Sequence, residues 1–344
     1  MARETTVNLV RDLARLSEND RTILSAYLNL RDGWKGVEEF VERRSRRLRP
    51  LLTKEEIDYF ETSLSFLADF LDEKKEAGFA GPGLAFFADL GADFTRGVEL
   101  TVAPEPLLAV DDQTIIHPLA LELDEFEPVG VVMIDAACVR ILVVAGEVKE
   151  DLNSFCEKIH HRSKKGGWSQ MRYQRRRDKE IDHFVKDAVK RSVEIFKDNG
   201  IRRVLLAGRD RMVKRLEDDL PREWQDRVIG KVRWDLDSSD DIVEKIRPLV
   251  NRAERDQERL LLGRLFSELR RGELALGGID KVQRALEIDQ VDTLILSRSL
   301  DQKVIEKLTT VAESCGPDVE FIPEGNEPLD AIGGAGAILR YKIS

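Results

Sequence analysis

An alternation of apolar and amphipathic segments in the second half of the chain limits the possible folds most strongly. Apolar residues from Ile181 to Phe196 recur at helical spacing, and Gly200 follows at a position typical of a helix C-terminus. Further segments predict a strand, a helix, a strand and a long helix in turn: 201–208, 210–219, 228–235 and 239–269. Such alternation is typical of an α/β domain, so we expect a central α/β domain with a mixed sheet.

Strands and helices are also predicted on both sides of this domain. Before it, the pattern predicts strands at 23–30, 83–90, 97–103, 128–135 and 138–147, and helices at 36–48 and 54–75. After it, the pattern predicts helices at 279–286 and 301–314 and strands at 291–298, 319–322 and 337–343. A chain of 344 residues is too long for one ordinary core. We predict three α/β domains: a divergent N-terminal domain at 1–126, the central domain at 127–269 and a small C-terminal domain at 270–344.

Composition excludes several classes of protein. The chain is 42% hydrophobic and 35% charged, as in soluble globular proteins, and no apolar run approaches the roughly 20 residues that cross a bilayer. Three distant cysteines and four scattered histidines give no metal-ligand pattern. We therefore expect a cytoplasmic protein without membrane contact, structural disulfide, metal or cofactor. The net charge of −10 argues against coating nucleic acid with the whole surface, but it permits one local basic contact.

The segment HHRSKKGGWSQMRYQRRR, from His160 to Arg177, provides such a contact. It is rich in Lys and Arg and contains no acid. The Gly166–Gly167 pair gives its centre wide backbone freedom, so we expect an exposed basic loop. Aromatic side chains between cations favour nucleic-acid binding. The residues predicted to contact RNA are His160, His161, Arg162, Lys164, Lys165, Trp168, Arg172, Arg175 and Arg176. The alternative is a solvated basic loop with no partner.

The same residues resemble a known family. GGWSQMRYQRRR is similar to the GGQ loop and following helix of the archaeo-eukaryotic class-1 release factor and Pelota family. The strands VVMID and VRILVVAGE resemble the start of that family's central domain, and GGIDKVQRALEIDQVDTLILSRSLD resembles the opening of its third domain. Three departures from the family pattern are present, and the first, a displaced glutamine, is expected of a divergent bacterial-type branch. Trp168 occupies the place of the family's glutamine and Gln170 follows two residues later; no NIKS decoding motif is present; and the C-terminal domain is short.

The resemblance implies a release or rescue factor that hydrolyses the ester of peptidyl-tRNA without reading stop codons. It implies that Gly166 and Gly167 let the loop enter the peptidyl-transferase centre. Gln170 would then present its backbone N–H to the oxyanion and help to place the water. The expected partners are rRNA and peptidyl-tRNA on the ribosome, bound by a monomer, and delivery by a translational GTPase stays open. The alternative is a tRNA-mimicking factor that occupies the ribosomal A site without hydrolysis.

Three other segments have less specific explanations. Cys156 has basic neighbours that lower a thiol pKa, but a buried structural thiol is the competing interpretation. AIGGAGAI, at 331–338, lacks the Lys-Ser/Thr of a phosphate loop, so we predict a tight turn. DSSDD, at 237–241, suggests helix capping more than a metal site.

Overall fold

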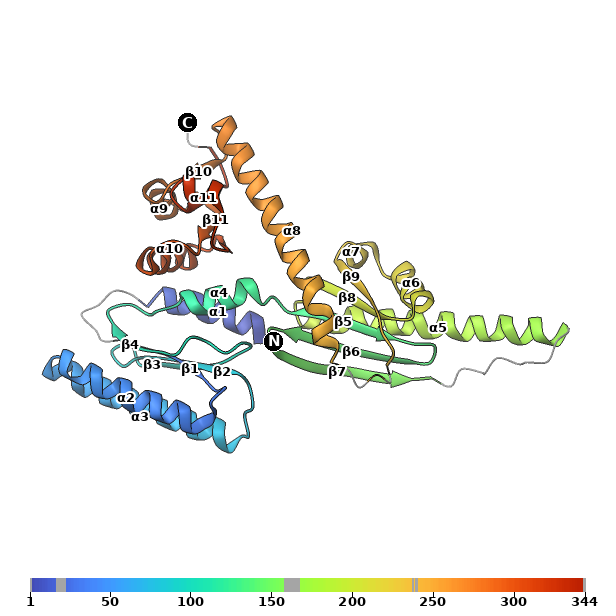
Figure 1. The fold of residues 1–344 in the computed structure, drawn as a ribbon, viewed down its shortest axis with the longest axis horizontal. Coiled ribbons are helices and arrows are strands. Elements are labelled where there is room, and N and C mark those ends of the chain that lie inside the picture. The colour runs from blue at the N-terminus through green and yellow to red at the C-terminus, as the bar shows by residue number, and fades with distance from the viewer. Residues whose placement is uncertain (1, 17–22, 158–167, 237, 239–240, 343–344) are drawn as a thin grey trace. The chain divides into compact units, whose positions relative to one another are not determined.

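The computed structural model describes the chain except for residues 1, 17–22, 158–167, 237, 239–240 and 343–344 (Figure 1). The side chains of residues 2–7 and 168–173 also lie outside the description. The chain forms two compact units. The central unit comprises Met1–Arg3 and Pro128–Gln257, and the terminal unit comprises Glu4–Glu127 and Glu258–Ser344. The predicted domain boundaries at residues 126 and 269 stay a prediction.

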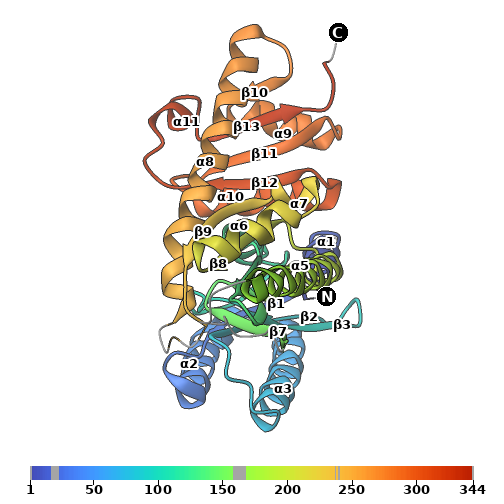
Figure 2. The same cartoon turned by 90° about the vertical axis from the view of Figure 1, so that its right-hand side faces the viewer.

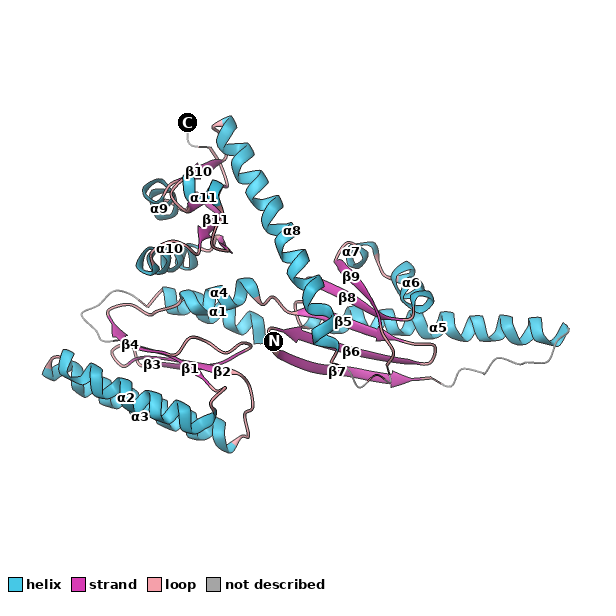
Figure 3. Ribbon diagram, viewed as in Figure 1, coloured by secondary structure: helices cyan, strands magenta, loops and turns pink. Residues whose placement is uncertain are grey.

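The first part of the terminal unit is an antiparallel sheet with strand order β3-β2-β1-β4 and helices on both faces (Figures 1 and 3). Leu84 and Phe86 of β2 pack toward α2 and α3, whereas Ala85 and Phe87 pack toward α1 and α4. Because both faces are buried, β2 is continuously apolar instead of alternating. The elements are α1 (Ala2–Ala14), β1 (Ile23–Asn29), α2 (Gly33–Leu48), η1 (Arg49–Leu51), α3 (Lys54–Glu76), β2 (Gly83–Asp89), β3 (Phe94–Leu100), β4 (Leu107–Asp111) and α4 (His117–Glu125).

The second part of the terminal unit has the strand order β10-β13-β11-β12, visible in Figure 2. Helices α9 and α10 contribute to a core with this sheet, and a second core includes Leu265 of the long helix α8 (Ile242–Arg271). Gly333 and Gly334 have φ angles of 94° and 72°, so the predicted tight turn is confirmed. The remaining elements are β10 (Ala275–Gly277), α9 (Ile279–Glu287), β11 (Val291–Ser297), α10 (Gln302–Cys315), β12 (Asp318–Ile322), α11 (Glu327–Ala331) and β13 (Ala335–Leu339).

Helix α4 joins the two parts of the terminal unit. The Glu306 carboxylate accepts hydrogen bonds from the backbone N–H groups of Ile116 and His117, at 2.6 and 3.2 Å. These donors belong to the N-terminus of α4, where a negative charge is favourable. At the other end of the helix, the backbone N–H of Phe321 donates to Asp124 at 2.8 Å. Residues almost 200 positions apart in sequence are thereby held in one compact unit.

Glu313 makes the stability of the terminal unit depend on pH. Burial on α10 raises the pKa of its carboxyl group from the usual 4.5 to about 7; the charge of Arg11 lowers it and that of Asp318 raises it. The folded state therefore keeps a proton that the unfolded chain releases above pH 4.5, so stability falls as pH rises from 4.5 to about 7. At 1.36 kcal/mol per pKa unit, the loss is about 3 kcal/mol.

We expect Glu313→Gln to remove this loss. The variant should be more stable than the wild type by up to about 3 kcal/mol at pH 8 and nearly equal to it at pH 4. Urea unfolding of both proteins from pH 4 to pH 8 gives the difference between their free energies of unfolding. The contributions of the other titrating groups are the same in both proteins and cancel in this difference. A difference that is constant from pH 4 to pH 8 would contradict the prediction.

The central unit is a mixed sheet with strand order β7-β6-β5-β8-β9. Strands β7, β6 and β5 pair antiparallel, whereas β5, β8 and β9 pair parallel. Phe184 of α5 lies in the core on one face with residues of α6 and α7, and Ile246 of α8 lies in the core on the other. The elements besides α8 are β5 (Val129–Ile134), β6 (Cys138–Ala145), β7 (Val148–Cys156), α5 (Trp168–Asp198), β8 (Arg203–Gly208), α6 (Asp210–Asp219), α7 (Arg222–Gln225) and β9 (Val228–Arg233).

The predicted α/β class, the mixed central sheet and the hairpin of β5 with β6 are confirmed. Other parts of the prediction are wrong. The strand predicted at 97–103 is β3, which lies three residues earlier, and the last strand ends at Leu339. Eight elements of the described part of the chain were not predicted: α1, η1, β4, α4, β7, α7, β10 and α11. Most of them are short, and β7 is largely exposed and charged, so they lack an apolar pattern long enough to identify them.

Candidate nucleic-acid interface

The basic segment connects β7 to α5 in the central unit. Gly166, Gly167 and five of the predicted RNA-contacting residues lie outside the described part of the chain: His160, His161, Arg162, Lys164 and Lys165. The structure describes strand β7 before these residues and helix α5 after them. Strand β7 ends at Cys156, and helix α5 begins at Trp168.

The second half of helix α5 packs against the sheet. The ring of Phe184 contacts that of Phe155 on β7, with centroids 5.8 Å apart, and the Arg191 guanidinium lies 4.1 Å from the centroid of Phe155. From Ile181 onward the helix has a buried face, whereas the described side chains at 174–180 are exposed or half-buried. Figure 1 shows the first turns of α5 projecting beyond the ends of the strands. The helix therefore presents the start of its cationic sequence away from the sheet.

The exposed arginines of this helix differ in their partners. Arg175 has no ion-pair or hydrogen-bond partner among the described residues, and Arg176 contacts Glu180 at 3.2 Å. An exposed ion pair of this kind contributes about 0–1 kcal/mol, so a phosphate can replace the carboxylate at little cost. Arg177 is half-buried and does not belong to the exposed group. Positions 172, 175 and 176 share one side of the helix because they are spaced i, i+3 and i+4.

Ion pairs between α5 and α6 were not predicted from the sequence. Asp178 lies 3.6 Å from Arg211 and 3.7 Å from Arg215, and Asp182 lies 3.3 Å from Arg215. These pairs hold the carboxylates of Asp178 and Asp182 toward α6. Sequence spacing gives no signal for them, because the partners lie on different elements and about 30 residues apart.

Trp168 and Gln170 lie in the first turn of α5, whereas the sequence placed them in the loop. The structure describes their backbone but not their side chains. The first four N–H groups of an α-helix have no intrahelical carbonyl to bind, and the positive end of the helix dipole lies there. The backbone N–H of Gln170 therefore belongs to a set of donors suited to an anion. Arg175 and Arg176 follow this turn and add exposed positive charge near the same end of the helix.

A disulfide joins Cys138 and Cys156, so the prediction of a chain without structural disulfides is wrong. The two residues face each other in the register of β6 and β7, with Cα atoms 4.1 Å apart. Cys156 is exposed, and it is neither a buried thiol nor a free nucleophile. The sequence argument missed the pair because β7 was not predicted, and the inference of a reducing compartment from absent disulfides no longer holds. The disulfide fixes the β7 end of the basic segment.

Within the described ranges, no three His, Cys, Asp or Glu side chains lie close enough together to hold a metal ion. The backbone N–H of Val243 donates to Asp241 at 3.1 Å, so this part of the acidic cluster caps the start of α8 as predicted. None of the helices that the structure describes is long and apolar enough to cross a membrane.

Comparison with known proteins agrees with the resemblance seen in the sequence. A family model described as Bacterial archaeo-eukaryotic release factor family 10 matches residues 115–258, which include the basic segment and α5. A second, described as eRF1 domain 3, matches residues 256–343. The chain is 26% identical over 308 residues to Peptide chain release factor subunit 1 of Thermococcus kodakarensis, covering 70% of this chain and 74% of that one. The chain belongs to the archaeo-eukaryotic release factor and Pelota family.

One further relative and two solved structures also match. The chain is 35% identical over 91 residues to the Protein pelota homolog of Methanocaldococcus jannaschii, covering 25% of this chain and 26% of that one. The crystal structure of the archaeal translation termination factor aRF1 aligns over 99% of both chains, with 18% identity and a TM-score of 0.31. The structure of Saccharomyces cerevisiae Dom34 aligns over 73% of both chains, with 13% identity and a TM-score of 0.45.

Proposed function

We propose that this chain is a release or rescue factor that binds the ribosome and hydrolyses the ester of peptidyl-tRNA without reading a stop codon. One family model matches residues 115–258 and a second matches residues 256–343. The similar proteins include peptide-chain release factors and a Pelota homolog. The observation that carries the proposal is that the matched region contains a basic Gly-Gly segment next to the projecting end of α5. The factor acts as a cytoplasmic monomer, and rRNA and peptidyl-tRNA are its partners.

The first step of the mechanism is electrostatic. The cations of the basic segment and of α5 bind phosphates of rRNA and tRNA, which offset the repulsion among these like charges. Arg175 has no partner among the described residues to give up before it binds a phosphate. Arg176 replaces its contact with Glu180 by a contact with a phosphate. These contacts position the segment but do not select a base sequence.

The chemical step needs water next to the ester carbonyl and a donor for the developing oxyanion. Gln170 supplies the donor through its backbone N–H, which lies in the first turn of α5. Its side chain helps to orient the water. Gly166 and Gly167 allow the backbone to approach the tRNA end closely. Water attacks the ester carbonyl, the acyl–oxygen bond breaks, and the proton lost by the water passes to the leaving 3′-oxygen of the tRNA, so that free peptide acid and deacylated tRNA result.

Codon recognition is not part of the proposal. The family's NIKS motif is missing from the sequence, and the turn between α2 and α3 reads RRLRPLLTK, from Arg46 to Lys54. This turn is basic and contains Leu51, whose surface is 78% exposed. Nothing in this turn repeats the family motif that the resemblance associates with decoding of stop codons.

A non-hydrolytic role is the second candidate. It is favoured by the position of Gln170, which follows the glycine pair only after Trp168 and Ser169. A glutamine displaced in this way is compatible with a factor that fills the ribosomal A site and leaves peptidyl-tRNA intact. The two candidates differ in whether the peptide is released.

Peptide release from ribosomes that carry labelled peptidyl-tRNA separates them. We expect the wild-type protein to release the peptide, and Gln170→Ala to release it about 10- to 100-fold more slowly because the water is less well placed. Co-sedimentation with ribosomes should be equal for both proteins, which serves as the control for binding. Ribosome binding without release by the wild type would exclude the hydrolase and leave the occupancy factor.

A further inference from the structure

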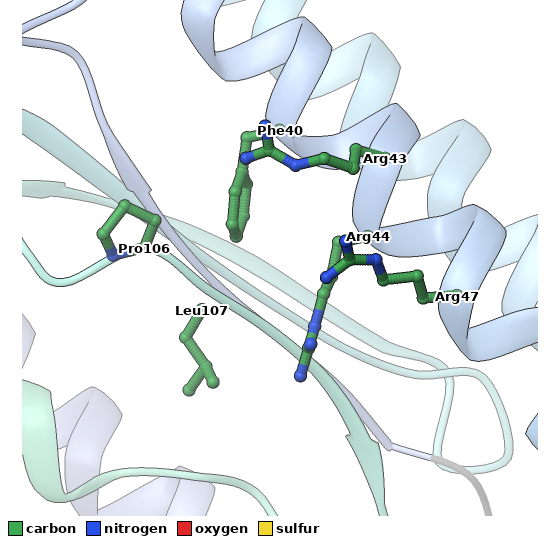
Figure 4. Close-up of a pocket in the computed structure, with 6 residues that line it drawn as sticks. All are labelled: Phe40, Arg43, Arg44, Arg47, Pro106 and Leu107. Atoms are coloured by element: carbon green, nitrogen blue, oxygen red, sulfur yellow. The ribbon is translucent and has the colours of Figure 1, made fainter.

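A second basic site lies on α2 in the terminal unit, and it consists of three arginines. Arg43, Arg44 and Arg47 line a cavity of about 240 Å³ together with Phe40, Pro106 and Leu107. Figure 4 shows Arg43 and Arg47 reaching from α2 toward Phe40 and Arg44, with Pro106 and Leu107 on the opposite side. The sequence predicted only a charged helix here. The structure brings it together with the start of β4, more than 60 residues away.

The acids of α2 do not neutralise these arginines. Glu38, Glu39 and Glu42 are the acids of this helix, and each contacts another cation: Lys75, Lys35 and Arg46 respectively. Arg43 and Arg47 have no ion-pair or hydrogen-bond partner among the described residues. The site thus carries positive charge without a counter-ion from its own helix, in a chain with a net charge of −10.

Arg44 has a fixed place in the cavity. It is half-buried, and its Nε donates to the backbone carbonyl of Leu108 at 3.2 Å. A guanidinium has five N–H donors, so the other four stay available for an anion. Phe40 packs partly against the core between α2 and the sheet, which fixes the aromatic side of the cavity. The wall is therefore built by packing as well as by flexible side chains.

Helix electrostatics alone do not explain the cluster. Cations near a helix C-terminus are favourable, but the effect falls off within the last turn. It accounts for Arg46 and Arg47, which lie in the last turn of α2, and not for Arg43 and Arg44. It also gives no reason for three guanidinium groups to face one cavity.

We propose that this arginine cavity binds the phosphate backbone of single-stranded RNA. Arginine forks match phosphate oxygens with paired hydrogen bonds, and an aromatic neighbour adds a surface for a base. The cavity is smaller than the 300–1,000 Å³ clefts that typically enclose small ligands, so it suits one nucleotide of a longer strand. The choice of RNA over an acidic peptide rests on the proposed function. The site is separate from the basic segment and does not take part in hydrolysis.

The test is binding of a fluorescent oligouridylate to the full-length protein, followed by anisotropy over a series of KCl concentrations. Arg43→Ala/Arg47→Ala should weaken binding about tenfold at low salt. It should also reduce the slope of log affinity against log salt by about 1.4, since each phosphate contact in a single strand contributes about 0.7. The matched control is Arg46→Ala/Arg49→Ala, which removes the same charge from the same end of α2. Those arginines contact Glu42 and Glu61 and do not line the cavity, so the control should change both values little.

Two further measurements identify the site and its ligand. The first measurement adds Arg175→Ala/Arg176→Ala to the wild type, the cavity variant and the control, which weakens RNA binding by α5. In this background Arg43→Ala/Arg47→Ala should still lower the affinity for oligouridylate by the same factor. Polyglutamate of equal charge should compete poorly for the cavity. Equal binding by the cavity variant and its control, with matching circular dichroism, overturns the proposal. Polyglutamate that displaces the oligouridylate at equal charge overturns the assignment to RNA.

Release assays with the same proteins keep this proposal distinct from the proposed function. If the cavity variant alone loses oligouridylate binding while no form of the protein acts on ribosomes, the RNA site stands and the release function fails. If the wild type releases peptide and the cavity variant binds oligouridylate normally, the function stands and the RNA site fails.

Discussion

Gln170→Pro is expected to slow peptide release by about 100- to 1,000-fold at saturating factor, which is the typical effect of removing one oxyanion donor. Proline has no backbone N–H, so this change removes the donor itself, whereas Gln170→Ala removes only the side chain. Position 170 lies in the first turn of α5, where proline is tolerated because the helix makes no hydrogen bond there. The measurement is single-turnover release from ribosomes carrying labelled peptidyl-tRNA.

Ser169→Pro is the matched control for this change. It introduces the same ring one residue earlier in the same turn and removes a neighbouring N–H. It should slow release much less than Gln170→Pro, and both variants should co-sediment with ribosomes as the wild type does. Equal losses from the two prolines would mean that the start of the helix matters and that the N–H of Gln170 has no separate role.

The sequence predicts a strand well when the strand is buried along its whole length. Strand β8 is buried at every position between β5 and β9, and the predicted strand at 201–208 ends where β8 ends and starts two residues before it. Strand β7 has the opposite character. It lies at the edge of the sheet and most of its residues are exposed, and Phe155, which packs against the core, is half-buried. Its register with β6, and hence the disulfide of Cys138 with Cys156, depends on pairing that local pattern does not encode.

The two basic sites differ in how far the sequence predicts them. The segment from His160 to Arg177 is contiguous, so its charge and its resemblance to the family are visible without a structure. The arginine cavity is formed by α2 and the start of β4, and only the fold brings the arginines to Pro106 and Leu107. From sequence, the arginines of α2 look like any solvated helix face, because their lack of partners becomes evident only when each acid is matched to another cation.

Phe184→Ala is expected to destabilise the central unit by about 3–5 kcal/mol, because it removes a fully buried ring and leaves a cavity. The ring packs between α5 and the sheet and contacts Phe155 edge to face. A loss of this size is a large part of the roughly 5–15 kcal/mol that stabilises a typical domain. At about 3 °C per kcal/mol for a unit of this size, the unfolding midpoint should fall by about 10–15 °C in differential scanning calorimetry.

Phe66→Ala makes the same chemical change on α3, where the side chain is 43% exposed, and it should lower the midpoint far less. Phe184 lies fourteen positions after Gln170, or about 21 Å along the helix axis, so it does not reach the proposed chemistry. Release per folded molecule should therefore stay near the wild-type value well below the midpoint. Midpoints lowered equally by the two changes would show that Phe184 does not hold α5 to the sheet. Slow release by a fully folded Phe184→Ala protein would instead mean that the position of the α5 tip depends on this contact.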